Sequence, residues 1–557
     1  MIIPSSDKKM ALWAKDIVDV CRSSVGNRLT YARTMKQWAS TGSDTETPAI
    51  YNRIGPHIDR MASYLYSPSD LRFHLEFKVE YPEDILDKAD VASRYLTRHF
   101  DRQDIDIKFG AGVEQALTYG SCLMKTMWGH DGLTARLVMP WNFGVYREDL
   151  NDLYAQEATC ETTFISKHDF WRRISHLPNR VELFKRALSY AKKDDAHSTP
   201  NSYFHNVILA GSSPAVATSP PASNTTQGSV LPTFPFQEMP ILATEVIDGL
   251  LPFHELTVVN DETGDFSTIQ VVEPDIIVTV TRKNLFLPGE LPYSLIQPNP
   301  TQGYFWGMSE MHYLTRLQAL LRDRMEDIKQ IMGLQYDKVL AFIGFSSMND
   351  EEYDNFKTRH WIAQEQPGAK IEDLTPQLPP NAFQEIDAVI KMMDDVSGFQ
   401  NILSGQGEPG VRAGSHAQTL MKTASPRLRD RAIIVERQCA DLGQSCLKLL
   451  QAKDSTTLWT DPKNPETEFL LAQLPDDVRV AVDSHSSSPV YQEDTKALAS
   501  FLLRSGVIDG ASFMDLIPDI PMRENLKAKW KKREAAKQEF IRQHPELLTK
   551  GKGRPKM

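Results

Sequence analysis

Side chains that could do chemistry are sparse in this sequence of 557 residues. Three adjacent acidic pairs offer oxygen ligands of the kind a Mg²⁺-dependent nuclease needs, namely Asp261-Glu262, Glu351-Glu352 and Asp394-Asp395. Adjacent carboxylates on helices or turns are, however, usually solvated. The sequence contains no GxxxxGK[ST] loop for ATP, no HExxH zinc motif and no GxSxG nucleophile elbow. We therefore expect no enzyme activity, no metal and no cofactor.

The histidines and cysteines are equally dispersed. Of fourteen histidines, His360 and His416 lie in segments of functional interest, and we expect both to be polar surface groups. The five cysteines form no CxxC pair, so reduced, buried thiols in a cytosolic compartment are expected. Cys439 and Cys446 lie two helical turns apart on one face and should fill the core as small apolar groups. All five are Cys21, Cys122, Cys160, Cys439 and Cys446.

A glycine-rich segment separates two stretches with helical periodicity. Five glycines and a proline crowd residues 398–414, which predicts a mobile loop rather than a regular element. The polar side chains of this loop are Gln400, Asn401, Gln406 and Arg412. Any function of these residues depends on the elements that hold the two ends of the loop.

Two helices and a short β-rich excursion precede that loop. Between 309 and 333 the apolar residues recur at steps of three and four, which predicts one helix ended by Gly333. The stretches VLAFIGF and RHWIAQEQ, within 336–375, are rich in β-branched and aromatic residues and predict strands. A second helix is expected from about 381 to 399. The stripe of the first helix is Leu314, Leu317, Leu321, Met325, Ile328 and Met332.

A long helix is expected after the loop, from Ser415 to about Leu449. Its apolar or small residues keep steps of three and four over more than thirty residues, which requires burial along nearly the whole length. Pro426 interrupts it, and two explanations remain open. The helix is kinked there, because proline removes one hydrogen bond at a cost of roughly 3 kcal/mol. Alternatively, a new helix starts with Ser425 as N-cap and Pro426 at its first position.

This order of parts resembles the portal protein of tailed double-stranded DNA bacteriophages. The matching segments are GYFWGMSEMHYLTRLQALLRDRMEDIKQIMG, the excursion, the returning helix, and ILSGQGEPGVRAGSHAQTLM. Two N-terminal segments, TPAIYNRIGPHIDRMASYLYSP and ALTYGSCLMKTMW, also look like portal segments. The resemblance covers about residues 30–500, and it lies in the order and spacing of the parts rather than in one motif.

The resemblance implies an α+β, mainly helical, elongated subunit that assembles into a ring around a central channel. Its parts would be a wing, a stem of two helices, a clip, a tunnel loop and a crown with a basic tail. In chain order they are 1–305 (wing), 306–334 (first stem helix), 335–380 (clip), 381–399 (second stem helix), 400–414 (tunnel loop), 415–490 (long wing helix and returning strand) and 491–557 (crown and tail).

The resemblance also assigns roles to residues. Gln400, Asn401, Gln406 and Arg412 would touch DNA phosphates at the narrowest point of the channel. The first stem helix would line about 35 to 40 Å of channel at 1.5 Å per residue. Its charged residues would face neighbouring subunits or the channel, with ordinary surface ion pairs as the plainer explanation. These residues are Arg316, Asp323, Arg324, Asp327 and Lys329.

The wing region should combine helices and strands. We expect helices over 8–38, 48–66, 82–100, 105–119, 167–175 and 180–192. Strands are expected in LRFHLEFKVE, CLMKTMW, LTARLVM, EATCETTFI, HELTVVN, STIQVV and DIIVTVTR, and later in VRVAVDSHSSSP. Residues 194–235 are rich in Ser, Thr, Pro and Ala without periodicity, which predicts an exposed or partly disordered insertion.

Charge is distributed unevenly. The net charge is −11, which argues against a protein that wraps nucleic acid by neutralising its charge. Residues 523–556 hold twelve Lys or Arg against four Glu, so this tail carries +8 and the remainder −19. A solvated helix is the plainer interpretation of the tail, and DNA contact is the alternative. The residues that would make that contact are Lys527, Lys529, Lys531, Lys532 and Arg533.

The resemblance implies a set of partners and a location. The chain would form a homo-oligomer, as a dodecamer, with double-stranded DNA in its channel. It would bind the major capsid and scaffolding proteins, the terminase large subunit, and then a tail or adaptor protein. It would lie at the portal vertex of the virion, and in the host cytoplasm during assembly. No apolar run is long enough to span a membrane, and no secretory signal is expected.

Two other classes of protein remain as alternatives. One is a ring-forming head-tail adaptor or another structural virion protein, which the tunnel-loop order disfavours. The other is a DNA-processing enzyme, disfavoured by the missing ATP motif and by the lack of a carboxylate constellation.

Overall fold

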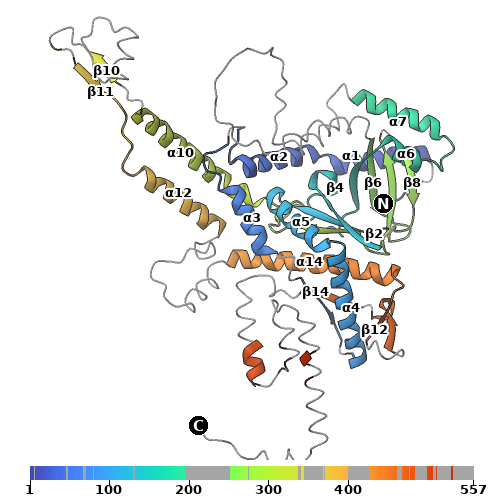
Figure 1. Cartoon of the computed structure of the whole chain (residues 1–557). Coiled ribbons are helices and arrows are strands. Elements are labelled where there is room, and N and C mark those ends of the chain that lie inside the picture. The colour runs from blue at the N-terminus through green and yellow to red at the C-terminus, as the bar shows by residue number, and fades with distance from the viewer. Residues whose placement is uncertain are drawn as a thin grey trace, which may run out of the picture.

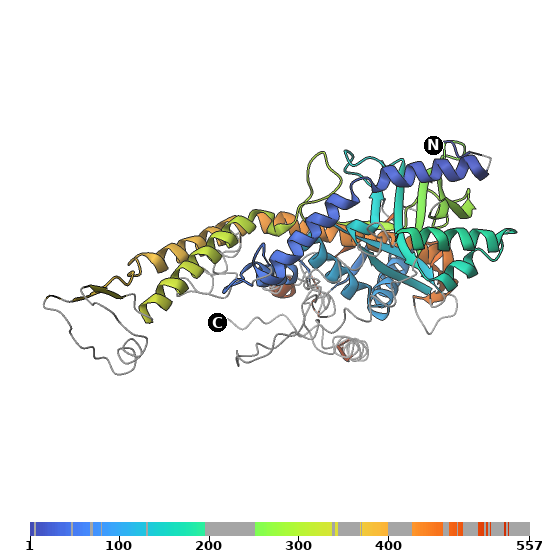
Figure 2. The same cartoon turned by 90° about the horizontal axis from the view of Figure 1, so that it is seen from above.

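A computed structural model describes the chain in several blocks. These are residues 1–194 (except 5–6, 46–47, 67–70, 80 and 130–131), 251–336 (except 274), 340–343, 368, 370–398, 426–482 (except 461–466 and 476), 499–505, and the single residues 508, 510, 513, 529, 530 and 533. The described part mixes helices and strands, as an α+β chain should. Figures 1 and 2 show an α+β body from which a pair of helices, α10 and α12, projects to one side.

A five-stranded antiparallel sheet forms one half of the body, in the order β4-β5-β6-β7-β8. Its central strand β6 is buried at nearly every position, because helices cover both faces. Leu256 and Val258 pack with α1 (Asp7–Arg22), whereas Leu251 and Phe253 pack near α6 (Lys167–Arg173) and α7 (Arg180–Asp194). The strands are Phe143–Val145, Ala158–Ile165, Leu251–Val259, Phe266–Val272 and Ile276–Thr281.

A second, three-stranded antiparallel sheet has the order β3-β2-β9. Its strands are Gly132–Val138, Cys122–Gly129 and Tyr293–Ile296, so β9 joins a hairpin from a distant part of the chain. Helix α5 (Ile105–Tyr119) packs on this sheet through Gly112. A Cβ at Gly112 would lie 2.7 Å from Ile296 Cδ1 and 2.9 Å from Leu137 Cδ2, so the helix approaches the sheet more closely than an alanine would allow.

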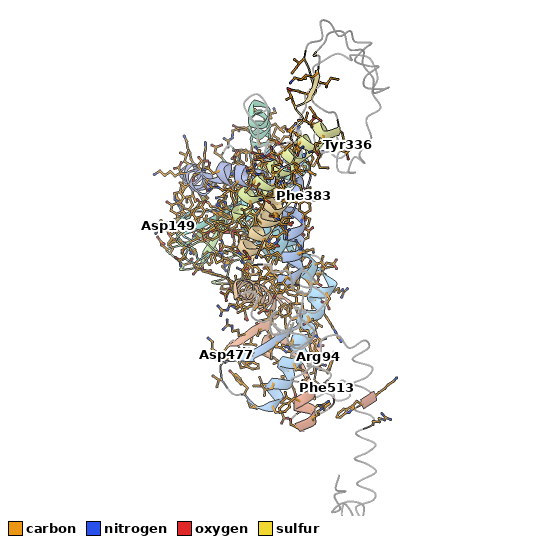
Figure 3. All side chains as sticks on the ribbon, turned by 90° about the vertical axis from the view of Figure 1, so that its left-hand side faces the viewer. Arg94, Asp149, Tyr336, Phe383, Asp477 and Phe513 are labelled. Carbon is orange, nitrogen blue, oxygen red and sulfur yellow. The ribbon has the colours of Figure 1, made fainter. Side chains whose placement is uncertain are left out.

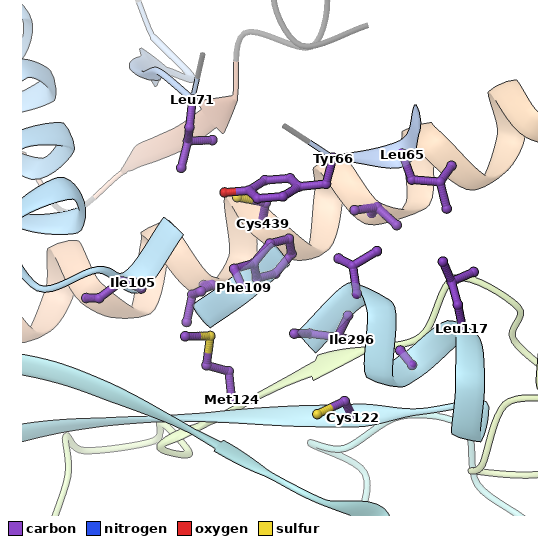
Figure 4. Packing of buried hydrophobic residues seen from close by; sticks show 14 of the residues in the cluster. Leu65, Tyr66, Leu71, Ile105, Phe109, Leu117, Cys122, Met124, Ile296 and Cys439 are labelled. Carbon is purple, nitrogen blue, oxygen red and sulfur yellow. The ribbon is translucent and has the colours of Figure 1, made fainter. Parts of the chain in front are cut away.

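The largest hydrophobic core lies around α5 and α14 (Pro426–Lys453). Figure 4 shows Tyr66 and Phe109 together beside Cys439 of α14. The Tyr66 and Phe109 rings meet edge to face with centroids 4.9 Å apart. All five cysteines are buried and unpaired, as the sequence predicts.

Helix α14 also carries the chain back to its N-terminal part. Strand β14 (Val478–Val482) pairs antiparallel with β1 (Phe73–Phe77), with Phe73 opposite Val482. This confirms the strand predicted in VRVAVDSHSSSP, which pairs with a strand from the N-terminal part of the chain. The short strands β12 (Thr457–Trp459) and β13 (Glu468–Leu470) pair beyond the end of α14.

The projecting hairpin consists of α10 (Thr315–Tyr336) and α12 (Ala382–Ser397). A single 3₁₀ turn, η4 (Glu310–Tyr313), precedes α10. At the far end β10 (Leu340–Ile343) pairs antiparallel with β11 (Lys370–Asp373). Figure 3 shows Tyr336 and Phe383 on this hairpin at one end of the molecule, and Asp477 and Phe513 toward the other.

Several boundaries differ from the sequence prediction. The helix expected over 8–38 is two helices, α1 and α2 (Val25–Thr41), separated at Ser23 and Ser24. Gly333 does not end α10, which continues to Tyr336, because a glycine on an exposed helix face weakens a helix without stopping it. The strand opposite VLAFIGF is Lys370–Asp373, whereas the segment RHWIAQEQ lies outside the described residues.

Other predicted helices and strands are confirmed. The stripe of α3 (Ile54–Leu65) is buried at every predicted position. Helix α4 (Glu83–Arg102) and helices α5 to α7 lie where the periodicity placed them. The described part of α14 begins at Pro426. The residues that would distinguish a kink at Pro426 from a new helix starting there precede it and lie outside the described part.

Candidate functional site

The loop residues singled out in the sequence cannot be placed. Gln400, Asn401, Gln406 and Arg412 lie outside the described residues, and so do His360 and His416. The structure does fix both attachment points of that loop. Helix α12 ends at Gly398, whose left-handed φ of 74° and N–H bond to Asp394 O form a C-cap. The described chain resumes at Pro426, the first residue of α14.

The basic tail is described at only three positions. Lys529 and Arg533 are exposed and have helical backbone conformation. Trp530 lies against Gly510, where a Cβ would come within 2.5 Å of the indole Nε1. Lys527, Lys531 and Lys532 lie outside the described part. Two of the five predicted cations are therefore accessible to solvent.

Most of the charged residues predicted on the first hairpin helix are paired within the subunit. Arg324 spans the hairpin, with its Nε 2.8 Å from Glu385 of α12 and its Nη1 3.2 Å from Asp327. Asp323 pairs with Arg322, and Lys329 lies 3.5 Å from Glu326. These are exposed pairs worth about 0 to 1 kcal/mol each. The plainer surface-pair explanation therefore holds for four of the five residues.

Arg316 is the fifth of these residues. It is exposed and makes no ion pair with another described residue. Asp387 and Asp395 of α12 are likewise exposed and without an ion pair among the residues that the structure describes. Lys391 of α12 is exposed in the same way, so the hairpin presents one cation on α10, and two anions and one cation on α12, without an ion pair among the described residues.

The two hairpin helices differ in charge. Helix α10 carries four cationic and three acidic side chains, a net charge of +1. Helix α12 carries four carboxylates and one lysine, a net charge of −3. When two such hairpins lie next to each other, the positively charged α10 of one attracts the negatively charged α12 of the other.

Large apolar side chains are exposed along both helices and at the tip. Tyr336 is 85% exposed and Phe383 58% exposed, although both lie on or beside regular helices. Single exposed apolar residues are ordinary, but a run along one projecting element is typical of an interaction surface. We call this set the hairpin apolar face, although its members lie on more than one side of the two helices and at the tip: Leu320, Met332, Leu334, Tyr336, Ile343, Leu374, Phe383, Met392 and Val396.

The base of the hairpin is fixed by polar contacts that sequence reasoning missed. Arg53, at the start of α3, forms an ion pair at 2.5 Å with Asp394 near the end of α12. The fully buried Gln318 accepts the Arg53 backbone N–H at 3.2 Å and donates to Tyr51 O at 2.8 Å. Both hairpin helices are therefore attached to the same segment, residues 51–53. One of the acidic pairs first considered for metal binding, Asp394-Asp395, is partly used in this contact.

A second group of charges attaches the hairpin to the long helix. Glu310 in η4 lies 2.6 Å from Arg431 of α14, and His57 of α3 lies 3.9 Å from the same carboxylate. All three side chains are at least nine-tenths buried. Burial alone would raise the pKa of Glu310, but the nearby His57 side chain and the charge of Arg431 lower it below the usual value. We call Glu310, His57 and Arg431 the base cluster.

A further buried network joins the two sheets of the body. Lys125 of β2 lies 2.7 Å from Glu161 of β5 and 2.6 Å from Glu255 of β6. Tyr293 of β9 donates to Glu161 at 2.9 Å. Burial raises the pKa of Glu161, but Lys125 and Arg136 more than offset this and keep it below its usual value. The sequence signal for this network was the presence of charged residues within strands that were predicted to be buried. The residues with which they pair come from distant segments of the chain.

The described residues offer little for covalent or metal chemistry. Burial raises the pKa of every cysteine, to about 12 for Cys122 and Cys160, so these thiols are not activated nucleophiles. Among the described residues no three His, Cys, Asp or Glu side chains gather as metal ligands. Asp261 pairs with the N-terminal amine, and Glu351-Glu352 lies outside the described part.

Comparisons with known proteins add no relative. The sequence matches no known family and no curated protein. No described helix is both long and apolar enough to cross a membrane.

Proposed function

We propose that this chain is the subunit of a phage portal, the ring through which double-stranded DNA enters and leaves the capsid. The observation that carries the proposal is the projecting hairpin of α10 and α12 with its two-stranded tip, followed in the chain by a glycine-rich segment and the long helix α14. The sequence order of these parts supports the same proposal. In it, α10 and α12 are the stem and β10 and β11 belong to the clip.

The hairpin apolar face supports ring assembly with a second copy as its partner. A protein that works alone gains nothing from apolar side chains along a projecting element, whereas contact with a neighbour removes them from water. The net charges of +1 on α10 and −3 on α12 favour α10 of one copy beside α12 of the next. Contact between two different faces is heterologous and closes into a ring when the rotation permits.

The remaining parts take their roles from this arrangement. Residues 400–414 form the tunnel loop, where Gln400, Asn401, Gln406 and Arg412 contact phosphates as DNA passes. The body is the wing, and residues 491–557 form the crown with the basic tail. The clip receives the terminase large subunit, which supplies ATP hydrolysis, and later the tail adaptor. The excess of acidic residues outside the tail lets DNA slide without being gripped.

Electron microscopy of the purified full-length protein tests the proposal. We expect closed rings with a central opening, most of them twelvefold. A deletion of Gly405 to Gly410 should leave the rings intact and impair genome packaging or retention, because a loop contributes little to subunit packing. Particles without a central opening would contradict the portal assignment, and loss of rings in the deletion variant would contradict the tunnel assignment.

A further inference from the structure

An aromatic pocket lies on the body where α2, the end of α5 and the segment before α10 meet. Its volume is about 290 Å³, near the lower limit of ~300 Å³ for typical ligand pockets. The structure places no part of the described chain in it. The residues that carry the argument are Arg28, Tyr31, Tyr119, Tyr304, Trp306 and His312.

The walls of this pocket are held in place by their own hydrogen bonds. The Arg28 guanidinium lies 4.3 Å above the Trp306 ring and donates to the carbonyls of Pro140 at 3.1 Å and Phe143 at 2.9 Å. The Trp306 indole N–H donates to Glu148 at 2.8 Å. The polar groups at the floor are therefore already satisfied, and a ligand must be recognised through ring surfaces and shape.

The rim consists of accessible aromatic side chains. Tyr304 is 39% exposed, and the Tyr31 and His312 rings lie 6.4 Å apart. The Tyr31 hydroxyl accepts the Ser309 N–H at 3.1 Å, which fixes the orientation of the ring. Fixed aromatic walls of this kind bind proline-rich peptides, because proline rings fit against aromatic faces and a polyproline helix loses little entropy on binding.

The chain contains a segment of matching chemistry. Residues 229–238, SVLPTFPFQE, hold Pro232 and Pro235 at the P-x-x-P spacing. They belong to the 195–250 stretch outside the described part, between the end of α7 and the start of β6 at Leu251. They carry a single acidic residue and no lysine or arginine, so they suit a pocket with satisfied polar groups.

The chain length also permits this contact. Pro140 begins the 3₁₀ turn Pro140–Asn142 that leads into β4. Strand β4 lies two strands from β6 in the same sheet, or about 10 Å laterally. Fifteen residues lie between Pro235 and Leu251, and this stretch spans up to about 50 Å when extended. We propose that the aromatic pocket binds residues 229–238 of the same chain. This inference is independent of the proposed function.

Photo-crosslinking on the full-length protein tests this inference. A benzoylphenylalanine at Tyr304 should crosslink to a peptide containing residues 229–238, as identified by mass spectrometry. The matched control carries the same group at Tyr154, which is 47% exposed and lines a different cavity, and should not give that product. Replacing Pro232→Ala and Pro235→Ala together should lower the crosslink yield at least fivefold.

A reciprocal variant guards against a local effect at Tyr304. The photoreactive group at Phe234 should crosslink to residues 27–31 or 301–312. A mixture of isotope-labelled and unlabelled chains separates the sources, and crosslinks within one chain are the expected result. Crosslinks only between chains, crosslinks to another segment, or an unchanged yield in the double proline variant would each overturn the inference.

Discussion

Glu310 and Arg431 form a buried ion pair with 2.6 Å between carboxylate and guanidinium, across the junction of the hairpin and the long helix. Only 2% of the Glu310 side chain and 6% of the Arg431 side chain are exposed. Glu310 lies one turn before α10, and Arg431 lies five residues into α14. The hairpin therefore cannot tilt against α14 without separating two buried charges, which couples the two elements mechanically.

Replacing Arg431→Met should destabilise the protein by about 3 to 5 kcal/mol, because Glu310 then stays buried without its main counter-charge. The urea midpoint of the unfolding transition measures this effect. The matched control is Arg324→Met, which breaks exposed pairs and should cost no more than about 1 kcal/mol. Similar midpoints for the two variants would show that the base cluster does not hold the hairpin to α14.

Acid should weaken the same junction. The pKa of Glu310 is lowered in the folded protein, so the folded state favours the ionised carboxylate. Its stabilising contribution is present above the unfolded pKa of about 4.3 and is lost as the pH falls through the lower folded value. Below about pH 4.5 the wild type should lose more stability than Glu310→Gln. Parallel stability curves for the two proteins between pH 6 and 3 would contradict this role for Glu310.

Two helix glycines should respond in opposite ways to alanine. Gly443 of α14 packs on β1 and β14, where a Cβ would lie 2.6 Å from the buried Phe73 ring and 3.0 Å from Val480. Gly443→Ala should therefore destabilise by about 1 to 3 kcal/mol. Gly333 of α10 has open space around it, and Gly333→Ala should stabilise by about 0.5 to 1 kcal/mol. Thermal unfolding of both variants checks the prediction, and a stabilised Gly443→Ala would refute the close packing.

Charges placed on the hairpin apolar face should block assembly. The double variant Phe383→Glu and Met392→Glu should fold normally, because both side chains are exposed, at 58% and 44%. It should remain monomeric in size-exclusion chromatography, since a desolvated carboxylate at either position opposes an interface there. The control Val181→Glu changes a residue that is 53% exposed on α7 and should assemble as the wild type does. Unchanged assembly of the double variant would place the subunit contacts elsewhere.

The sequence was most informative where burial repeats with a regular period. The α3 stripe of Ile54, Ile58, Met61 and Leu65 is buried as predicted, because a one-sided helix has few other ways to hide those residues. The alternation in β1 was visible for the same reason. Breaks were less predictable, since no proline separates α1 from α2, and Gly333 continues a helix that it was expected to end.

Long-range partners were beyond sequence reasoning. Nothing in the local pattern pairs β1 with a strand about 400 residues later, or brings His57 to Glu310 and Arg431. The same holds for Lys125 and its two carboxylates, because a buried charge is recognisable only when its partner is known. The tunnel-loop residues, the C-terminal tail contacts, and the ring itself stay predictions.

The mass of the assembled particle tests the central claim most directly. Light scattering of the full-length protein at micromolar concentration should give a particle of about twelve subunits, each of 63.0 kDa, because we propose that a neighbouring copy covers the hairpin apolar face. The double variant Phe383→Glu and Met392→Glu serves as the dissociated reference in the same experiment. A monodisperse wild-type monomer of 63.0 kDa would contradict the portal assignment.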